Sequence, residues 1–309
     1  MLKKSLVALG ALLVVLIAVN LTSAKLPAMP AASGEFITLQ GKEIHYTERP
    51  GADPAVVMVH GLPGSVDDFD QVIARLPGRH VVAVDRPGFG WSRGGWLPFQ
   101  QQLDVLHDLV ARLHLAPAVV VGHSYGGTAA LGLAARFPDD VTSLVLAAPA
   151  GGDMRADRLM IAQARIVKAT EKPVLGELFN MTVGNLVLRA SAEMGAREAF
   201  DPGRVAGDYV HRLLAVSMTP GNLAALADDR LEFDSVMRWL DGHVGEVRAP
   251  VHIVAAQDDK LVELPYVRQL QHALRDAQLT VVDGSHMIVD THPDVLADQI
   301  SSAAKAAPR

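Results

Sequence analysis

A serine placed between two glycines is the pattern in this chain that most directly suggests chemistry. Gly122-His123-Ser124-Tyr125-Gly126 follows the apolar run 118–121 and precedes a pattern typical of a helix. On a sharp strand-to-helix turn the Ser124 hydroxyl would stand clear of the backbone, and Gly122 and Gly126 would avoid the clashes of such a bend. A hydroxyl in this position can act as a nucleophile when a base lies beside it. The plainer alternative is that Ser124 only caps the helix.

Five short motifs in a fixed order resemble those of the α/β-hydrolase family. They are HGLPGS at 60–65, DRPGFGWS at 85–92, GHSYGG at 122–127, DDKLV at 258–262 and GSHM at 284–287. The resemblance covers most of the chain from Glu35 onward. It implies a serine hydrolase whose nucleophile, acid and base follow one another along the chain, with Ser124 as the nucleophile. Relatives that open epoxides or remove halides carry an aspartate here, so Ser124 argues against both reactions.

The nucleophile needs a base, and the base needs a carboxylate that holds its tautomer. His286, in the loop after the last predicted strand, is the candidate base. Asp258 and Asp259 compete for the role of the acid. The resemblance favours Asp259, because the family's acid is usually followed by an apolar pair, here Leu261-Val262. The chain departs from the family at Ala256, where a glycine is common.

A hydrolase of this kind also needs two backbone N–H groups that stabilise the oxyanion of the tetrahedral intermediate. The resemblance implies the N–H of Tyr125, directly after the nucleophile, and that of Leu62, in the loop after the strand 55–59. Gly61 allows this loop to approach closely. His60 is interpreted as a brace for the loop rather than as a reacting group.

Short apolar runs alternate with helix-like segments, which predicts an α/β fold with a mostly parallel sheet covered by helices on both faces. The predicted strands lie at 36–39, 43–47, 55–59, 80–85, 118–121, 141–147, 251–256 and 279–282, and helices at 100–115, 124–137, 264–274 and 293–303. The alternation stops between residues 150 and 248, where only helical patterns occur. We therefore predict a core formed by residues 35–149 and 249–309, with residues 150–248 as an inserted helical cap.

The cap holds six of the ten methionines of the chain: Met154, Met160, Met181, Met194, Met218 and Met237. Methionine side chains adapt to irregular apolar ligands. One hypothesis is a lid over a pocket for an acyl chain or another hydrophobic group. An ordinary helical core explains the same residues.

The N-terminus predicts export from the cytoplasm. Lys3 and Lys4 precede an uncharged run from Ser5 to Leu21, which as a helix would be about 25 Å long. Residues 1–24 are thus either a membrane anchor or a signal peptide cleaved near Ser23-Ala24, and residues 25–34 form a tether. Both readings put the core in the periplasm or outside, anchored to the inner membrane or released.

Composition excludes several other classes. A net charge of −6 without a basic patch argues against nucleic acid as a partner, and the absence of cysteine excludes disulfides and thiolate metal sites. The segment 85–90 lacks the third glycine and the lysine of a phosphate loop, so we interpret it as a structural turn. No metal-binding pattern occurs among the twelve histidines, and no cofactor is expected.

Together these features predict an esterase-like or lipase-like serine hydrolase that cleaves a carboxylic ester, with a hydrophobic acyl group, through an acyl-enzyme. The same residues serve amide, thioester and carbon–carbon hydrolases, and also cofactor-free haloperoxidases or perhydrolases. A non-catalytic binding protein that kept the fold is a further alternative, against which the intact serine, aspartate and histidine weigh.

Overall fold

The computed structural model describes residues 2–22 and 25–307, without the side chains of residues 2–9. Its centre is one eight-stranded sheet with the order β1-β2-β4-β3-β5-β6-β7-β8. The strands are β1 (Glu35–Leu39), β2 (Lys42–Arg49), β3 (Ala52–Val59), β4 (Arg79–Val84), β5 (Ala118–His123), β6 (Val141–Ala147), β7 (Val251–Ala256) and β8 (Ala277–Val282). β2 pairs antiparallel with β1 and β4, and all other neighbours are parallel. The predicted mostly parallel α/β sheet is confirmed.

The central strands are buried on both faces, which explains their continuous valine-rich sequences. Alternate side chains point to opposite sides: Val57 and Val59 of β3 pack with one set of helices, and Val56 and Met58 with the other. The first set contains α3 (Phe99–Arg112), α4 (Tyr125–Arg136) and α10 (Leu264–Ala273). The second contains α2 (Asp70–Ala74), α11 (Ile288–Thr291) and α12 (Pro293–Ala306).

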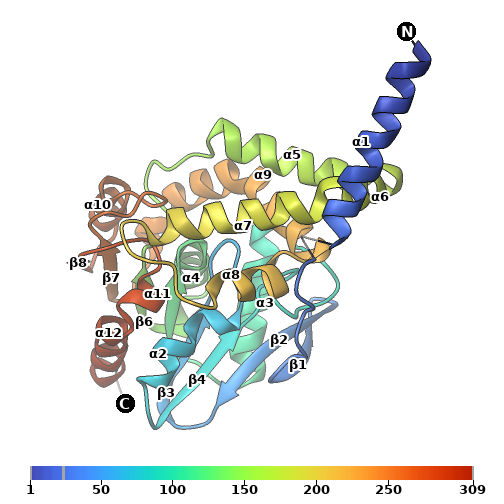
Figure 1. Cartoon of the computed structure of the whole chain (residues 1–309). Helices are drawn as coiled ribbons and strands as arrows, with labels where there is room; N and C mark the ends of the chain where they lie inside the picture. The colour runs from blue at the N-terminus through green and yellow to red at the C-terminus, as the bar shows by residue number, and fades with distance from the viewer. Residues whose placement is uncertain (1, 23–24, 308–309) are drawn as a thin grey trace.

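The chain between β6 and β7 is helical and forms the cap, as predicted. It contains α5 (Arg158–Thr170), α6 (Pro173–Phe179), the π-helix η3 (Asn180–Gly184), α7 (Asn185–Phe200), α8 (Tyr209–Arg212), the π-helix η4 (Leu213–Ser217) and α9 (Pro220–His243). In Figure 1 α5, α7 and α9 lie across one end of the sheet. Pro173 and Pro220 each occupy the first position of a helix, where a missing N–H costs nothing. The domain boundaries at 149 and 249 stay a prediction.

The N-terminal helix α1 (Leu2–Thr22) projects from the molecule beside the cap (Figure 1). Asn20 is fully buried; its Nδ2 donates to the Asn180 carbonyl at 2.7 Å, and its Oδ1 accepts from the Asn185 N–H at 2.9 Å. α1 is therefore bound to η3 and the start of α7. Among the residues whose side chains are described, no helix has both the length and the apolar character needed to cross a membrane. The predicted cleavage site at Ser23-Ala24 lies outside the described residues.

The predicted tether is held on the core. The Trp91 indole N–H donates to the Pro30 carbonyl at 3.0 Å, and His45 Nε2 bonds to the Ser33 carbonyl at 2.5 Å. Leu26 and Ala32 also pack against the core. Residues 25–34 thus lie along a fixed path between α1 and β1.

Candidate active site

Ser124 lies on the predicted sharp turn between β5 and α4. Its backbone has φ 54° and ψ −124°, a strained conformation for a residue with a side chain. A Cβ at Gly126 would lie 2.0 Å from the Val59 carbonyl oxygen, and one at Gly122 would lie 2.4 Å from the Gly126 oxygen. Only glycine fits at these two positions. The strain at Ser124 is thus maintained by close packing around it.

His286 and Asp259 form a buried pair, both about 5 % exposed. His286 Nδ1 lies 2.8 Å from Asp259 Oδ2. Because a carboxylate only accepts, Nδ1 carries the proton, and Nε2 of a neutral His286 is left free to act as a base. The other oxygen, Asp259 Oδ1, accepts from the N–H groups of Leu261 and Val262 at 2.8 and 2.9 Å. Asp258, the sequence alternative, is exposed.

His123 links this pair to the turn that carries Ser124. The rings of His123 and His286 are centred 5.0 Å apart, and His123 Nε2 lies 3.1 Å from the His286 carbonyl oxygen. Burial, followed by the nearby His286, lowers the pKa of His123 to about 3, so its ring is neutral and donates from Nε2. Within the described residues the Ser124 hydroxyl makes no hydrogen bond to His286. Such contacts often tighten only when substrate is bound.

The loop after β3 passes directly over the turn. A Cβ at Gly61 would lie 2.9 Å from the Ser124 Cβ, so this loop reaches the candidate nucleophile. Tyr125 is the first residue of α4, where the N–H has no acceptor within the helix. Leu62 follows Gly61 in the same loop. The two expected oxyanion donors therefore belong to two segments that come close to Ser124.

His60 is hydrogen-bonded to segments that follow two neighbouring strands. Its Nε2 accepts the Arg86 N–H at 3.0 Å, so Nδ1 carries the proton and donates to the Gly61 carbonyl at 3.0 Å. Burial, followed by the nearby Arg86 charge, holds the pKa of His60 well below its usual value. A neutral imidazole thus connects the ends of β3 and β4.

Sequence reasoning missed a buried ion pair between the core and the cap. Arg86 Nη1 lies 2.8 Å from Asp229 Oδ2 of α9, and Nη2 donates to the Gly61 carbonyl at 3.0 Å. Both side chains are at most 1 % exposed. Asp229 Oδ1 also accepts from Trp96 at 2.6 Å and Gln102 at 2.9 Å. Arg86 therefore joins the loop after β3 to the cap.

The segment 85–90 is a structural turn, as interpreted from the sequence. The buried Asp85 carboxylate accepts the N–H groups of Val66 and Trp91, each at 2.8 Å, and bonds to His45 Nδ1 at 2.7 Å. A Cβ at Gly90, where φ is +51°, would lie about 2 Å from this carboxylate. The carboxylate is fully used in fixing the turn.

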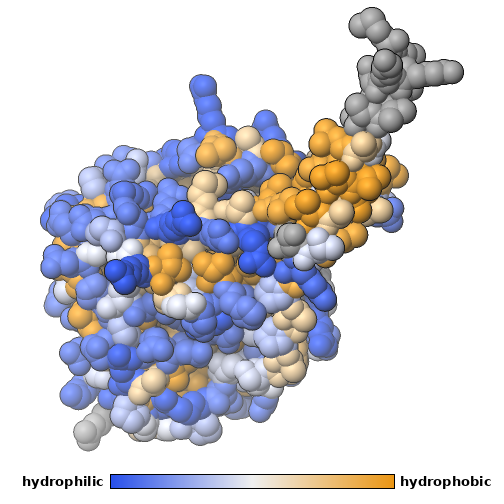
Figure 2. All heavy atoms as spheres, viewed as in Figure 1, coloured by the Kyte–Doolittle hydropathy of each residue, from blue (hydrophilic) through white to orange (hydrophobic). Residues whose placement is uncertain are grey.

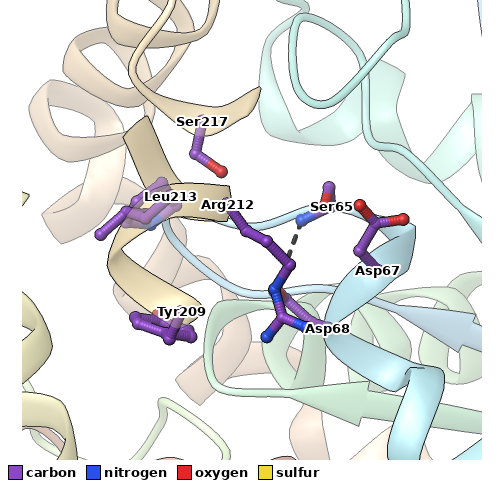
Figure 3. A pocket seen from close by; sticks show the side chains of 8 residues that line it. Ser65, Asp67, Asp68, Tyr209, Arg212, Leu213 and Ser217 are labelled. Atoms are coloured by element: carbon purple, nitrogen blue, oxygen red, sulfur yellow. Dashed lines mark hydrogen bonds between the residues drawn. The ribbon is translucent and has the colours of Figure 1, made fainter. Parts of the chain in front are cut away.

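A small polar pocket lies between α8, η4 and the loop after β3 (Figure 3). Its lining residues are Pro63, Ser65, Asp67, Asp68, Tyr209, Arg212, Leu213 and Ser217. Burial, followed by the charge of Asp290, raises the pKa of Asp68 to about 8, and burial raises that of Asp67 to about 6. Pro63 and Ser65 of the loop after β3 line the pocket, but Ser124 and His286 do not.

The cap methionines do not gather at one place. Met218 and Met237 are buried, whereas Met181 and Met194 are 52 % and 60 % exposed. The methionines therefore give no support to a single methionine-lined acyl pocket.

The described residues contain no group of three or more histidine, aspartate or glutamate side chains arranged to hold a metal ion.

Comparison with known proteins agrees with the architecture. The chain is 35 % identical over 252 residues to "Monoacylglycerol lipase ABHD6" of Rattus norvegicus, covering 79 % of this chain and 73 % of that one. It is 33 % identical over 237 residues to the "Pimeloyl-[acyl-carrier protein] methyl ester esterase" of Chromobacterium violaceum, covering 76 % and 87 %. The enol-lactonase structure from Burkholderia xenovorans superposes with a TM-score of 0.71 at 19 % identity, covering 88 % of this chain and all of that one. The sequence profile of the alpha/beta hydrolase fold matches residues 54–293, and the chain therefore belongs to the alpha/beta hydrolase family.

Proposed function

We propose that this protein hydrolyses a carboxylic ester through an acyl-enzyme formed on Ser124. The observation that carries the proposal is the buried contact of 2.8 Å between His286 Nδ1 and Asp259 Oδ2, beside the strained turn that bears Ser124. This contact orients the imidazole so that its Nε2 is available as a base. The names of the two relatives, a lipase and a methyl ester esterase, support an ester as the substrate.

In the proposed reaction the Ser124 oxygen attacks the ester carbonyl carbon while His286 Nε2 takes the hydroxyl proton. The oxyanion accepts hydrogen bonds from the N–H groups of Leu62 and Tyr125. His286 then gives its proton to the departing alkoxide, which leaves as the alcohol. Water, activated by the same imidazole, attacks the acyl-enzyme and releases the carboxylic acid and the free hydroxyl of Ser124.

Ser124→Ala tests the nucleophile. We expect this variant to lose labelling by a fluorophosphonate and to lose about 10⁴-fold or more in kcat on a p-nitrophenyl ester. The control is Ser191→Ala, an exposed serine of α7, which should keep both. Equal labelling of the parent and Ser124→Ala would contradict the proposal.

A substrate panel tests the bond and the acyl group. We expect esters of medium or long acyl chains to exceed acetyl esters in kcat/KM, and amides, thioesters and carbon–carbon substrates to react more slowly. A preference for acetyl groups would contradict the hydrophobic substrate. Peroxide-dependent halogenation faster than ester hydrolysis would favour the haloperoxidase alternative.

We further propose that residues 1–24 direct export of the core across the membrane. Lys3 and Lys4 before an uncharged run support export to the periplasm or the outside. The hydrogen bonds of Asn20 to the cap favour retention of residues 1–24 over their cleavage. A reporter that is active only outside the cytoplasm, fused after residue 34, should be active. The mass of the mature N-terminus decides between retention and cleavage.

A further inference from the structure

One part of the cap, residues 173–188, exposes several large apolar side chains to solvent. Residues 173–188 contain a single charged side chain, that of Glu177. The exposed apolar residues of this stretch are Val174 (78 %), Leu175 (47 %), Leu178 (53 %), Met181 (52 %) and Val187 (43 %). Scattered single residues of this kind need no explanation, but a contiguous group marks a contact surface.

The helix α1 continues this group. Leu12, Leu13, Val14 and Val15 are 55 %, 40 %, 66 % and 56 % exposed, and Val19 and Leu21 are also exposed. Asn20 fixes α1 against η3 through its buried hydrogen bonds. In Figure 2 the orange surface of α1 runs into that of the adjoining cap. We call the exposed apolar residues of 173–188 together with those of 12–21 the apolar platform.

Basic residues stand at the borders of the apolar platform. Lys172 and Arg189 flank the cap stretch directly, and Lys25 follows α1. Arg189 also donates to the Lys25 carbonyl at 3.1 Å, which brings two of these borders together. Glu171, next to Lys172, is paired with Lys168 Nζ at 2.6 Å, so the borders stay basic in a chain whose net charge is −6. Cations beside an apolar face suit a surface of anionic lipid head groups.

We propose that the apolar platform docks the protein on a phospholipid bilayer, with the cap residues at the boundary between head groups and acyl chains and residues 12–15 of α1 among the acyl chains. The exposure around α1 favours lipid over a protein partner. Residues 12–15 are consecutive and therefore point to nearly all sides of the helix at about 100° per residue. A protein face covers one side of such a helix, whereas lipid surrounds it.

A fluorescence experiment tests contact of the cap itself with lipid. The chain has no cysteine, so a single Val174→Cys in the full chain accepts one environment-sensitive dye. The matched control is Leu159→Cys, because Leu159 is 66 % exposed and also stands second in its helix, at the far end of α5. With vesicles of phosphatidylcholine and about 30 % phosphatidylglycerol, we expect a blue shift and quenching by brominated lipid at position 174 only. If the protein floated with the vesicles while the emission of the dye at position 174 still showed a water environment, the proposal would be overturned.

A binding experiment measures the contribution of the cap. Val174→Asp combined with Leu178→Asp should lower vesicle partitioning by about tenfold, whereas Leu159→Asp should not change it. Unchanged circular dichroism would show that the double variant is folded. Pure phosphatidylcholine should bind less than the anionic mixture. A concentration-dependent dimer in sedimentation, with no vesicle binding, would assign the platform to a second copy and overturn the proposal.

This inference does not depend on the proposed hydrolysis. Ser124→Ala should bind vesicles as the parent does, so loss of activity and loss of docking are separate outcomes. If Ser124→Ala remained active but docking were observed, the proposed function would fail and the platform would stand.

Discussion

The two adjacent aspartates after β7 have very different surroundings. Asp259 accepts from His286 and two backbone N–H groups, whereas Asp258 is exposed. We expect Asp259→Asn to lower kcat by about 10³- to 10⁴-fold, because an amide no longer stabilises the imidazolium or fixes its tautomer. Asp258→Asn should stay within about twofold of the parent. Steady-state kinetics on one ester checks both variants, and equal effects would contradict the assigned acid.

Asp68 gives a pH dependence of stability. Its pKa of about 8 in the folded protein lies above the ordinary value of 3.8. The folded protein therefore keeps a proton that the unfolded chain releases, and stability falls as the pH rises through this window. The side chain of the Asp68→Asn variant cannot ionise. Between pH 5 and pH 9 we therefore expect its free energy of unfolding to rise, relative to that of the parent, by about 1 kcal/mol or more. The value is modest because Asp68 borders solvent.

Urea unfolding at several pH values measures this difference. The exposed Asp283→Asn serves as the control for loss of a carboxylate elsewhere on the surface. A stability advantage of Asp68→Asn that shrinks as the pH rises would contradict the assigned ionisation.

At the residue scale, sequence reasoning can name groups that a local pattern marks, and it misses contacts between residues that are distant along the chain. Ser124, Asp259 and His286 stand in recognisable motifs, so their positions could be predicted. The partner of Arg86 could not, because Asp229 lies on a cap helix 143 residues away and no local pattern marks it. The hydrogen bond from His123 to the His286 carbonyl joins residues 163 positions apart, and no local pattern marks it either.

At the element scale, the contact between α4 and the end of β3 is the tightest around the site. Gly126→Ala would place a Cβ 2.0 and 2.5 Å from the carbonyl oxygens of Val59 and His60. We expect a loss of about 3 kcal/mol in the free energy of unfolding, because backbone must move, together with loss of activity. Gly195→Ala in α7 meets no atom within 4 Å and should be neutral or slightly stabilising. Chemical unfolding compares the two, and equal effects would contradict this account of the turn.

The elements of the core could be predicted closely because their strands are short, apolar and bounded by turns. The strand 251–256 matches β7 in both bounds, and β6 does likewise. The cap was harder: the pattern indicated helices, but not that Gly184 would fall in a π-helix that continues into α7. A glycine signals a possible break, and tertiary packing decides whether the helix continues.

For the whole molecule, the buried pair of Arg86 and Asp229 joins the cap to the core. Asp229→Ala leaves a buried guanidinium without its partner, and we expect a loss of about 3–5 kcal/mol in the free energy of unfolding. Asp228→Ala removes a partly exposed pair with Lys168 and should cost about 1 kcal/mol or less. Thermal unfolding compares these neighbours, and a cost for Asp229→Ala no larger than for Asp228→Ala would contradict the role of the pair.

The hydrogen bonds of residues 25–34 and of Asn20 hold the N-terminal part of the chain on the protein. Trp91 and His45 bind this segment to the core, while Asn20 of α1 binds η3 and the start of α7 in the cap. A flexible linker would let the core adopt many orientations relative to α1. Here the hydrogen bonds of Asn20 hold α1 against the cap, and those of Pro30 and Ser33 hold residues 25–34 against the core. A surface docked on α1 would therefore meet the rest of the protein in one orientation.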